Sequence, residues 1–498
     1  MSRLGSEATV FVSKKFVVSL LCIFGTVTFA SASYAGTTTS YVSLRTANAR
    51  QSASENALLS VRRSDVSARD AKGKISRLSP AEHMRRASIY MSNRAFEEAR
   101  AHWQALIDFY PQDSRVPEAM LGIGRSYFQS RYYDQAYAAY VRLARDYAAT
   151  REGREGLNFS AAALLRLGRP SEAAQRYIDY IDRYPTGERI DTAHLNTIDA
   201  LREANKPQEA LSWVSKTRQR FPNTPVETNA IFAQLRLYVA EGDWGKANST
   251  ADQLAQRSFS KGVQTSYAEV AYLKAFSLEQ SGRKDEAFAA YLTIADGVES
   301  YYGGLATERL LALGVAHKNN IVAERVARVA AEINSRSEQY PAPYRQVIVS
   351  AAKTRKLDPR FVLALIRQES VFLPFAKSPS GARGLLQLTI DAAQKYAVGA
   401  GLSTLRESQL YQPETSITLG AEYLSHLATM FPQMLEAVAA SYNGGEDNVA
   451  RWVKRAKRKD GGVFTSEIGF DETKAYVQKV MSNYRAYRQL YTAELIRR

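Results

Sequence analysis

Residues 96–99 read Phe-Glu-Glu-Ala, and the same arrangement of a turn, a polar pair and an alanine returns five more times along the chain. The later copies are Tyr133-Asp-Gln-Ala136, Ser171-Glu-Ala173, Gln208-Glu-Ala210, Gly245-Lys-Ala247 and Asp285-Glu-Ala287. The spacing of the alanines is constant from Ala99 to Ala247 and slightly longer at the last step. A regular period of this kind is typical of stacked helical hairpins. Residues 80–298 are therefore predicted to form a helical solenoid.

The period lies close to the roughly 34 residues of tetratricopeptide repeats, and the units loosely resemble that class. The small alanine lets two helices approach closely, and we expect aromatic side chains to fill the space between hairpins (Tyr110, Tyr140, Tyr147, Tyr180 and Tyr184). Three helices are expected to stop before a proline, which cannot continue a helix (Pro111, Pro185 and Pro222). Such an array offers a long curved surface on which protein partners can bind.

The length, the Cys and His counts and the net charge exclude several classes of protein. A chain of 498 residues, 45% of them hydrophobic, has room for two to four domains. One Cys excludes an intramolecular disulfide, and the five His lie far apart in the sequence, so we expect neither a metal site nor a cofactor. The formal net charge of +16 favours an acidic partner.

The N-terminus has the pattern of an export signal. Lys14-Lys15 precede an apolar run at residues 16–30, and small residues at Ser33 and Ala35 offer a cleavage site. The run is shorter than the roughly 20 residues that span a bilayer. We therefore expect a signal peptide at residues 1–35, a periplasmic protein without a membrane anchor, and no nucleic-acid partner. Residues 36–79 are expected to be a flexible leader.

A different kind of sequence begins at residue 341. Asp358-Pro359 is a strong helix start, because Asp accepts hydrogen bonds from free backbone N–H groups and Pro fits the first turn. The helix that follows is apolar on one face, and Glu369 lies four and three residues after Leu365 and Ile366 on that face.

The position of Glu369 favours a neutral carboxyl group. Burial on an apolar face and the negative end of the helix both raise the pKa of such a group, and a carboxyl that is neutral near pH 7 can act as a general acid. The alternative is an ordinary Glu that faces solvent at the end of a helix.

A loop of small residues and one amide follows Glu369. It contains Ser378, Gly381, Gly384 and Gln387, and such a loop suits the close approach of a sugar. Residues 370–390 contain no Asp or Glu, so a second catalytic carboxylate would come from elsewhere. Further on, Tyr442 is expected to point inward at the end of another helix, next to Asn443-Gly-Gly445.

Four motifs in this order resemble those of the soluble lytic murein transglycosylases. They are Arg367-Gln-Glu-Ser370, Gly384-Leu-Leu-Gln387, Ser441-Tyr-Asn-Gly-Gly445 and Glu467-Ile-Gly-Phe-Asp-Glu-Thr-Lys-Ala-Tyr-Val477. The resemblance covers residues 340 to 495. Upstream, Tyr301-Tyr-Gly-Gly-Leu-Ala306 is similar to the linker of that family, which places a helical linker at residues 299–340.

The resemblance implies an all-α protein, in which a TPR-like helical solenoid precedes an α-rich, lysozyme-like domain at residues 341–498. It also implies cleavage of the MurNAc-β-1,4-GlcNAc bond of peptidoglycan glycan strands with formation of a 1,6-anhydroMurNAc end. By position in the motifs, Glu369 is the single acid and base. Ser378 and Gln387 would line the cleft, Tyr442 would hydrogen-bond near the acid, and Glu472 would be a supporting carboxylate.

Several positions depart from the motifs of the family. They are Leu373, Leu386, Thr389-Ile390, Ser441, Gly444, Gly469 and Lys474. None removes a group that the reaction requires, so they bear on the range of substrates.

The stretch Arg451–Lys459 holds six basic residues in nine. Its two interpretations are a solvated helix face and attraction to the acidic cell-wall polymer.

Two other functions remain open at this point. A repeat scaffold whose lysozyme-like domain binds peptidoglycan without cutting it would also need the solenoid, and a lysozyme-type hydrolase would use the same domain. A protein-binding adaptor would leave the chain from residue 341 onward unexplained.

Overall fold

The computed structural model describes residues 56–67, 75–314, 319–378 and 380–498. The expected signal peptide at residues 1–35 and most of the expected leader lie outside these ranges. Within them the chain is helical, and extended pairing is confined to three isolated bridges: Lys377 with Arg383, Arg383 with Leu388, and Tyr491 with Arg497. No helix of the described ranges has both the length and the apolar character needed to cross a membrane.

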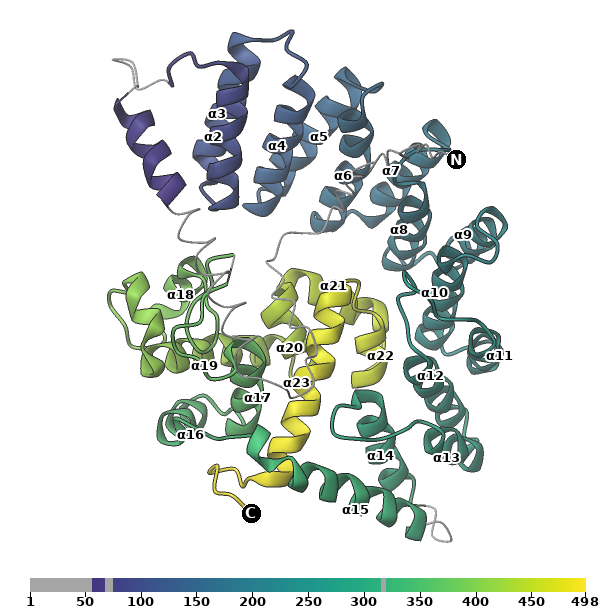
Figure 1. Cartoon of the computed structure of the whole chain (residues 1–498). Coiled ribbons are helices and arrows are strands. Elements are labelled where there is room, and N and C mark those ends of the chain that lie inside the picture. Colours follow the sequence, from purple (N-terminus) through teal and green to yellow (C-terminus); the bar gives the residue numbers. More distant parts are fainter. Residues whose placement is uncertain (1–55, 68–74, 315–318, 379) are drawn as a thin grey trace, which may run out of the picture.

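The N-terminal half is a series of antiparallel helix pairs that forms an arc (Figure 1). Its helices are α2 (Pro80–Ser92), α3 (Phe96–Phe109), α4 (Val116–Gln129), α5 (Tyr133–Asp146), α6 (Arg151–Arg166), α7 (Pro170–Arg183), α8 (Ile190–Glu203), α9 (Pro207–Arg220), α10 (Pro225–Glu241), α11 (Trp244–Ala255), α12 (Tyr267–Gln280) and α13 (Lys284–Leu292). We call these helices the solenoid. The predicted all-α fold class is confirmed.

The alanines of the repeat are buried, as the repeat pattern predicts. All six are fully buried: Ala99, Ala136, Ala173, Ala210, Ala247 and Ala287. Helices α3, α7 and α9 each end two residues before a proline, as their sequences predict. The aromatic prediction holds most clearly for Tyr140 and Tyr180, which are buried.

Residues 56–67 form a helix, so the expectation of a flexible leader is wrong for this stretch. Val61 and Asp65 are buried against the first repeat. The Asp65 carboxylate accepts hydrogen bonds from Arg86, from Tyr90 at 2.5 Å and from the His102 ring at 2.9 Å. The helix was missed because it docks through one acidic side chain and few apolar ones, which leaves little apolar periodicity in the sequence.

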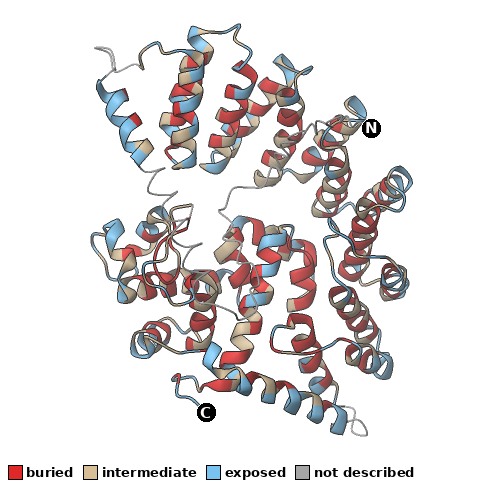
Figure 2. Cartoon of the chain, in the orientation of Figure 1, coloured by how far each residue is buried: buried red, intermediate tan, exposed pale blue. Residues whose placement is uncertain are grey.

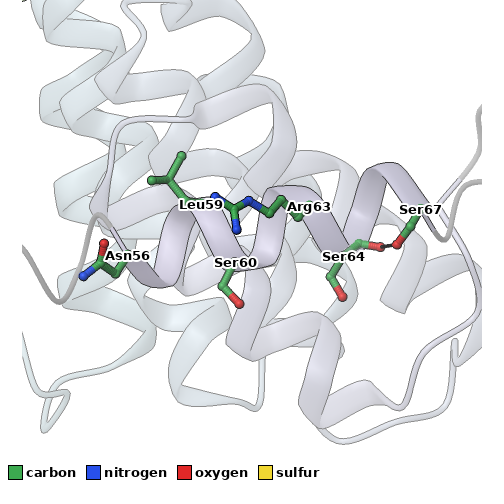
Figure 3. Close-up of a pocket in the computed structure, with 6 residues that line it drawn as sticks. All are labelled: Asn56, Leu59, Ser60, Arg63, Ser64 and Ser67. Carbon is green, nitrogen blue, oxygen red and sulfur yellow. Dashed lines mark hydrogen bonds between the residues drawn. The ribbon is translucent and has the colours of Figure 1, made fainter.

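The other face of this helix carries a surface hollow (Figure 3). Its lining residues all belong to the one helix: Asn56, Leu59, Ser60, Arg63, Ser64 and Ser67. A hollow lined by a single helix lacks the convergent polar groups of a ligand pocket, and we assign no site to it.

The C-terminal half packs inside the arc (Figure 1). Its elements are α14 (Tyr301–Leu313), α15 (Asn319–Ser335), η2 (Ser337–Gln339), α16 (Arg345–Thr354), α17 (Pro359–Ser370), α18 (Ile390–Ala397), η3 (Glu407–Tyr411), α19 (Pro413–Met430), α20 (Leu435–Gly444), α21 (Glu446–Ala456), α22 (Gly461–Ser466) and α23 (Asp471–Leu490). Figure 2 shows buried residues gathered on α17, α20 and α23, which form the centre of this domain. The proposed boundaries at residues 298 and 340 fall before α14 and after η2.

The basic stretch Arg451–Lys459 joins the two halves of the chain. The interpretation as a solvated helix face is therefore wrong for Arg451, Arg455 and Arg458, which are at least partly buried, while Lys454 and Lys459 are exposed as it predicts. Arg451 donates to Glu203 of α8 at 2.7 and 2.9 Å, and Lys457 donates to Glu241 at the end of α10 at 2.8 Å. Arg458 donates to a backbone carbonyl of α10. The two acidic partners lie 248 and 216 residues upstream, where no local pattern could connect them with this stretch.

Candidate active site

Helix α17 carries the candidate acid at its C-terminal end. The Asp358 carboxylate accepts a hydrogen bond from the backbone N–H of Arg360 at 2.9 Å, and Pro359 begins the helix as predicted. All residues from Phe361 to Ile366 are buried, so this part of the helix is covered on every side. Val371 and Phe372 then turn the chain sharply with positive φ angles of 50° and 62°, conformations that non-glycine residues rarely adopt. Glu369 therefore lies in the last turn of a helix whose position is fixed at both ends.

The Glu369 carboxyl group is half-buried and has one close partner. Tyr476 of α23 donates its O–H to Glu369 Oε1 at 2.6 Å. Burial raises the pKa of Glu369 to about 7, the Tyr476 hydrogen bond acts against this shift, and the charge of Glu472 adds to it. At neutral pH the group is present in both protonation states, so it can give a proton and take one back.

Tyr442 and Glu472 lie on the two elements that face Glu369. Tyr442, at the end of α20, donates its O–H to the Leu386 carbonyl at 2.7 Å. Burial raises the pKa of Tyr442 well above its ordinary value, and the nearby Glu369 charge adds to the shift. Glu472, in the first turn of α23, is exposed. Both residues are thus close enough to interact electrostatically with Glu369. The charge of Glu472 raises the pKa of Glu369, and the charge of Glu369 raises the pKa of Tyr442.

Ser378 and Gln387 hold the shape of the loop between α17 and α18. The Ser378 hydroxyl accepts a hydrogen bond from the Ala382 N–H at 3.0 Å, and the Gln387 amide nitrogen donates to the carbonyls of Ala376 and Gly384 at 3.0 and 2.8 Å. The side-chain N–H groups of Gln387 therefore bind carbonyls of the loop, and its side-chain oxygen is the atom that could accept a hydrogen bond from a ligand.

Gly384 lets this loop pass against a neighbouring turn. Its φ is +77°, and a Cβ atom there would lie 1.9 Å from the Leu410 carbonyl oxygen. Gly384 also donates its N–H to the Ala376 carbonyl at 3.0 Å. Only glycine fits this position without moving the loop that carries Gln387.

Sequence reasoning missed Tyr476 as a site residue. The signal was available, because Tyr476 lies four residues after Glu472, and residues four apart share one face of a helix. Glu436, in the first turn of α20, also has a pKa that burial raises to about 7, but it lies apart from Glu369, and its partner is Tyr301 of α14, at 3.4 Å. In the described parts of the chain, no three His, Cys, Asp or Glu side chains lie where they could share a metal ion.

The fold is a helical-repeat arc around an α-helical domain (Figure 1), and in that domain burial raises the pKa of the Glu369 carboxyl group to about 7. Residues 346–464 match the family described as "Transglycosylase SLT domain", and residues 121–188 and 160–225 match "Tetratricopeptide repeat". Residues 346–464 are thus similar to the transglycosylase SLT domain, which confirms the resemblance of this part of the chain to the soluble lytic murein transglycosylases.

Relatives with curated descriptions agree with this assignment. The chain is 34% identical over 155 residues to a putative soluble lytic murein transglycosylase of Haemophilus influenzae, which is 31% of this chain and 26% of the relative. It is 32% identical over 161 residues to the soluble lytic murein transglycosylase of Escherichia coli K12, which is 32% of this chain and 24% of the relative. The matches thus span about a quarter of these relatives.

Two solved structures align with most of the chain at low sequence identity. An inactive mutant of the lytic transglycosylase Slt from Pseudomonas aeruginosa has a TM-score of 0.49 at 19% identity, covering 83% of this chain and 81% of that one. A complex of a 70-kDa soluble lytic transglycosylase with bulgecin A has a TM-score of 0.47 at 17% identity, covering 84% and 90%.

Proposed function

We propose that this protein is an exported lytic transglycosylase that cleaves the MurNAc-β-1,4-GlcNAc bond of peptidoglycan glycan strands. The observation that carries the proposal is the Glu369 carboxyl group, which is half-buried at a helix end, hydrogen-bonded by Tyr476, and raised in pKa to about 7. The SLT domain match over residues 346–464 supports the substrate class.

In the proposed reaction, protonated Glu369 gives its proton to the bridging oxygen while the bond from that oxygen to C1 of MurNAc breaks. The resulting carboxylate takes the proton of the MurNAc C6 hydroxyl, whose oxygen bonds to C1. The product is a 1,6-anhydroMurNAc end, water is not consumed, and Glu369 finishes protonated. A second carboxylate to hold a water molecule is not required, unlike in an inverting hydrolase.

Ser378, Gln387, Tyr442 and Glu472 are proposed to support this step. The loop that Ser378 and Gln387 hold together would line the cleft, with the Gln387 oxygen facing the sugar. Tyr442 would fix the loop from the other side through the Leu386 carbonyl. Glu472 would keep the pKa of Glu369 high through its charge. Residues 1–35 are proposed to direct the protein to the periplasm.

Product analysis tests the proposal. Purified sacculi are digested with the full-length protein, and the released muropeptides are identified by mass spectrometry. We expect anhydro-muropeptides. Products with reducing ends would instead show a lysozyme-type hydrolase, and binding to sacculi without any released product would show a peptidoglycan-binding scaffold.

Removing the Tyr476 hydroxyl is expected to change the pH dependence of the reaction. The hydrogen bond stabilises the Glu369 carboxylate, so Tyr476→Phe should raise the pKa of Glu369 above about 7. The general acid then stays protonated to higher pH. We expect the alkaline limb of the kcat profile to move up by about one pH unit, the equivalent of one hydrogen bond to a charged group.

Tyr484→Phe is the matched control for this change. Tyr484 also lies on α23 and also donates to a carboxylate of the α17 segment, Asp358 at 2.9 Å, but at the opposite end of that helix. We expect Tyr484→Phe to leave the pH profile in place. Equal shifts in both variants, or none in Tyr476→Phe, would contradict the role of Tyr476.

A further inference from the structure

The first two turns of α23 form one wall of the proposed site, and they have two sides. Glu472 and Tyr476, four residues apart, share the side that faces Glu369. Lys474 lies midway between them and, two residues from each, points to the other side of the helix. That other side meets the solenoid.

Lys474 forms a buried ion pair with the solenoid. Its ammonium group donates to Glu269 of α12 at 3.1 Å and to the Gln264 carbonyl at 3.1 Å. Glu269 is 1% exposed and also accepts hydrogen bonds from Tyr302 and Thr265, both at 2.8 Å. The carboxylate is therefore fixed from several directions, and the position of Lys474 is fixed with it.

A second buried contact holds the chain just before α23. Glu467 is 1% exposed and pairs with Arg202 of α8, with Arg236 of α10 at 3.3 Å and with Arg455 of α21 at 2.8 Å. Helix α23 begins one short loop later, at Asp471. The solenoid thus contacts this region at two points, Glu467 before Glu472 and Lys474 after it.

We propose that Glu269, Arg202 and Arg236 of the solenoid are positioning residues for the proposed reaction: through Lys474 and Glu467 they hold the first turns of α23 so that Tyr476 and Glu472 face Glu369. This inference rests on the proposed function. The solenoid then completes the active site in addition to offering a binding surface. Small displacements of groups around a reacting bond lower rates strongly, which gives these distant contacts their effect on catalysis.

The test removes each partner of the Lys474–Glu269 ion pair in turn. Glu269→Gln in the solenoid and Lys474→Met in α23 each remove one charge with little change in volume. We expect each to lower kcat on soluble glycan strands about tenfold while KM stays within about twofold, because α23 is displaced while the sugar-binding loop is not. Since both changes break one contact, the double variant should be no slower than either single variant. Lys474→Arg, which keeps the charge, should retain the parental kcat.

Arg257→Met is the matched control for loss of stability. Arg257 pairs with Glu227 at 3.0 Å, a buried carboxylate, and both residues lie within the solenoid. We expect this variant to unfold at a lower temperature but to keep the parental kcat. Parental kcat in Glu269→Gln and Lys474→Met, or an equal loss in Arg257→Met, would overturn the positioning role.

Hydrogen exchange makes the test independent of the proposed function. Backbone amides of residues 471–477 are expected to exchange faster in Glu269→Gln than in the parent, while those of α17 stay unchanged. If the parent releases no product, the proposed function fails, but this measurement still decides whether the solenoid holds α23. Unchanged exchange over residues 471–477 would overturn the inference.

Discussion

Glu369→Gln is expected to lower kcat by ~10²–10⁴-fold, the contribution of a general acid and base. The glutamine amide has the shape of the carboxyl group but cannot give up a proton to the bridging oxygen. It can still accept the Tyr476 hydrogen bond, so the site should keep its geometry. The measurement is the rate of product release from purified glycan strands, with the affinity for the same strands recorded in parallel and expected to be unchanged.

Glu436→Gln is the control that separates the effect of the position of Glu369 from the effect of its raised pKa. Burial raises the pKa of Glu436, like that of Glu369, to about 7, and both residues belong to the same domain. Glu436, however, contacts Tyr301 of α14 instead of Tyr476. We expect Glu436→Gln to keep near-parental activity. If both variants lose activity alike, or if Glu369→Gln remains active, the assignment of Glu369 is wrong.

Glu369→Gln should also change stability in a direction that depends on pH. The folded protein raises the pKa of Glu369 from 4.5 to about 7, so the folded state favours the protonated form. Between these pH values the folded state loses stability as pH rises, and above pH 7 the buried charge destabilises it fully. The glutamine variant has no such charge and should unfold at a higher temperature than the parent above pH 7. Below pH 4 the difference should vanish.

Glu467→Gln is expected to destabilise the folded protein by about 3–5 kcal/mol, the cost of leaving buried charges without their partner. Glu467 balances three arginines, Arg202, Arg236 and Arg455, each largely buried. After the change, the half-buried Asp199 remains as the acidic group beside them. The measurement is the midpoint of denaturant unfolding at pH 7. Glu286→Gln, which breaks an exposed ion pair with Arg283, should leave the midpoint unchanged.

The pH dependence of unfolding provides a second measurement on Glu467. Burial alone would raise its pKa, but the charges of Arg202, Arg236 and Arg455 lower it to about 2. A depressed pKa contributes stability that is present above the unfolded value of 4.5 and is lost as pH falls toward 2. The parent should therefore lose stability over this window, and Glu467→Gln should lose less. Identical acid unfolding of the two proteins would contradict the pairing.

The repeats and the α17 segment could be predicted because their signals are local. Every repeat alanine is buried, since an alanine recurring at a fixed period marks a contact that every hairpin makes. Asp358 caps its helix as predicted, because capping depends on the order of residues at one helix end. The apolar side of the same helix predicts that Glu369 is shielded from solvent, and burial is the largest cause of its raised pKa. Local patterns of this kind determine which side of a helix is buried.

The sequence does not show which distant segment of the chain contacts a buried or charged side of a helix. The residues 451–459 read as basic and solvated, but Glu203 and Glu241 meet them from far upstream in the solenoid. The partner of Glu369 likewise comes from α23, 107 residues further on. Such contacts depend on how the arc wraps around the domain, which no single helix specifies.

The docked helix at residues 56–67 has a consequence for any shortened version of the protein. Leu78 donates its N–H to His83 Nε2, so the His83 proton lies on Nδ1 and faces His102 Nδ1 at 3.1 Å. His102 then has its own proton on Nε2, directed at Asp65. This relay connects two uncharged imidazoles to one acid. A recombinant protein that starts after residue 67 would leave the two histidines without their anion and Arg86 with Glu82 as its remaining carboxylate partner. Expression boundaries should therefore fall upstream of residue 56.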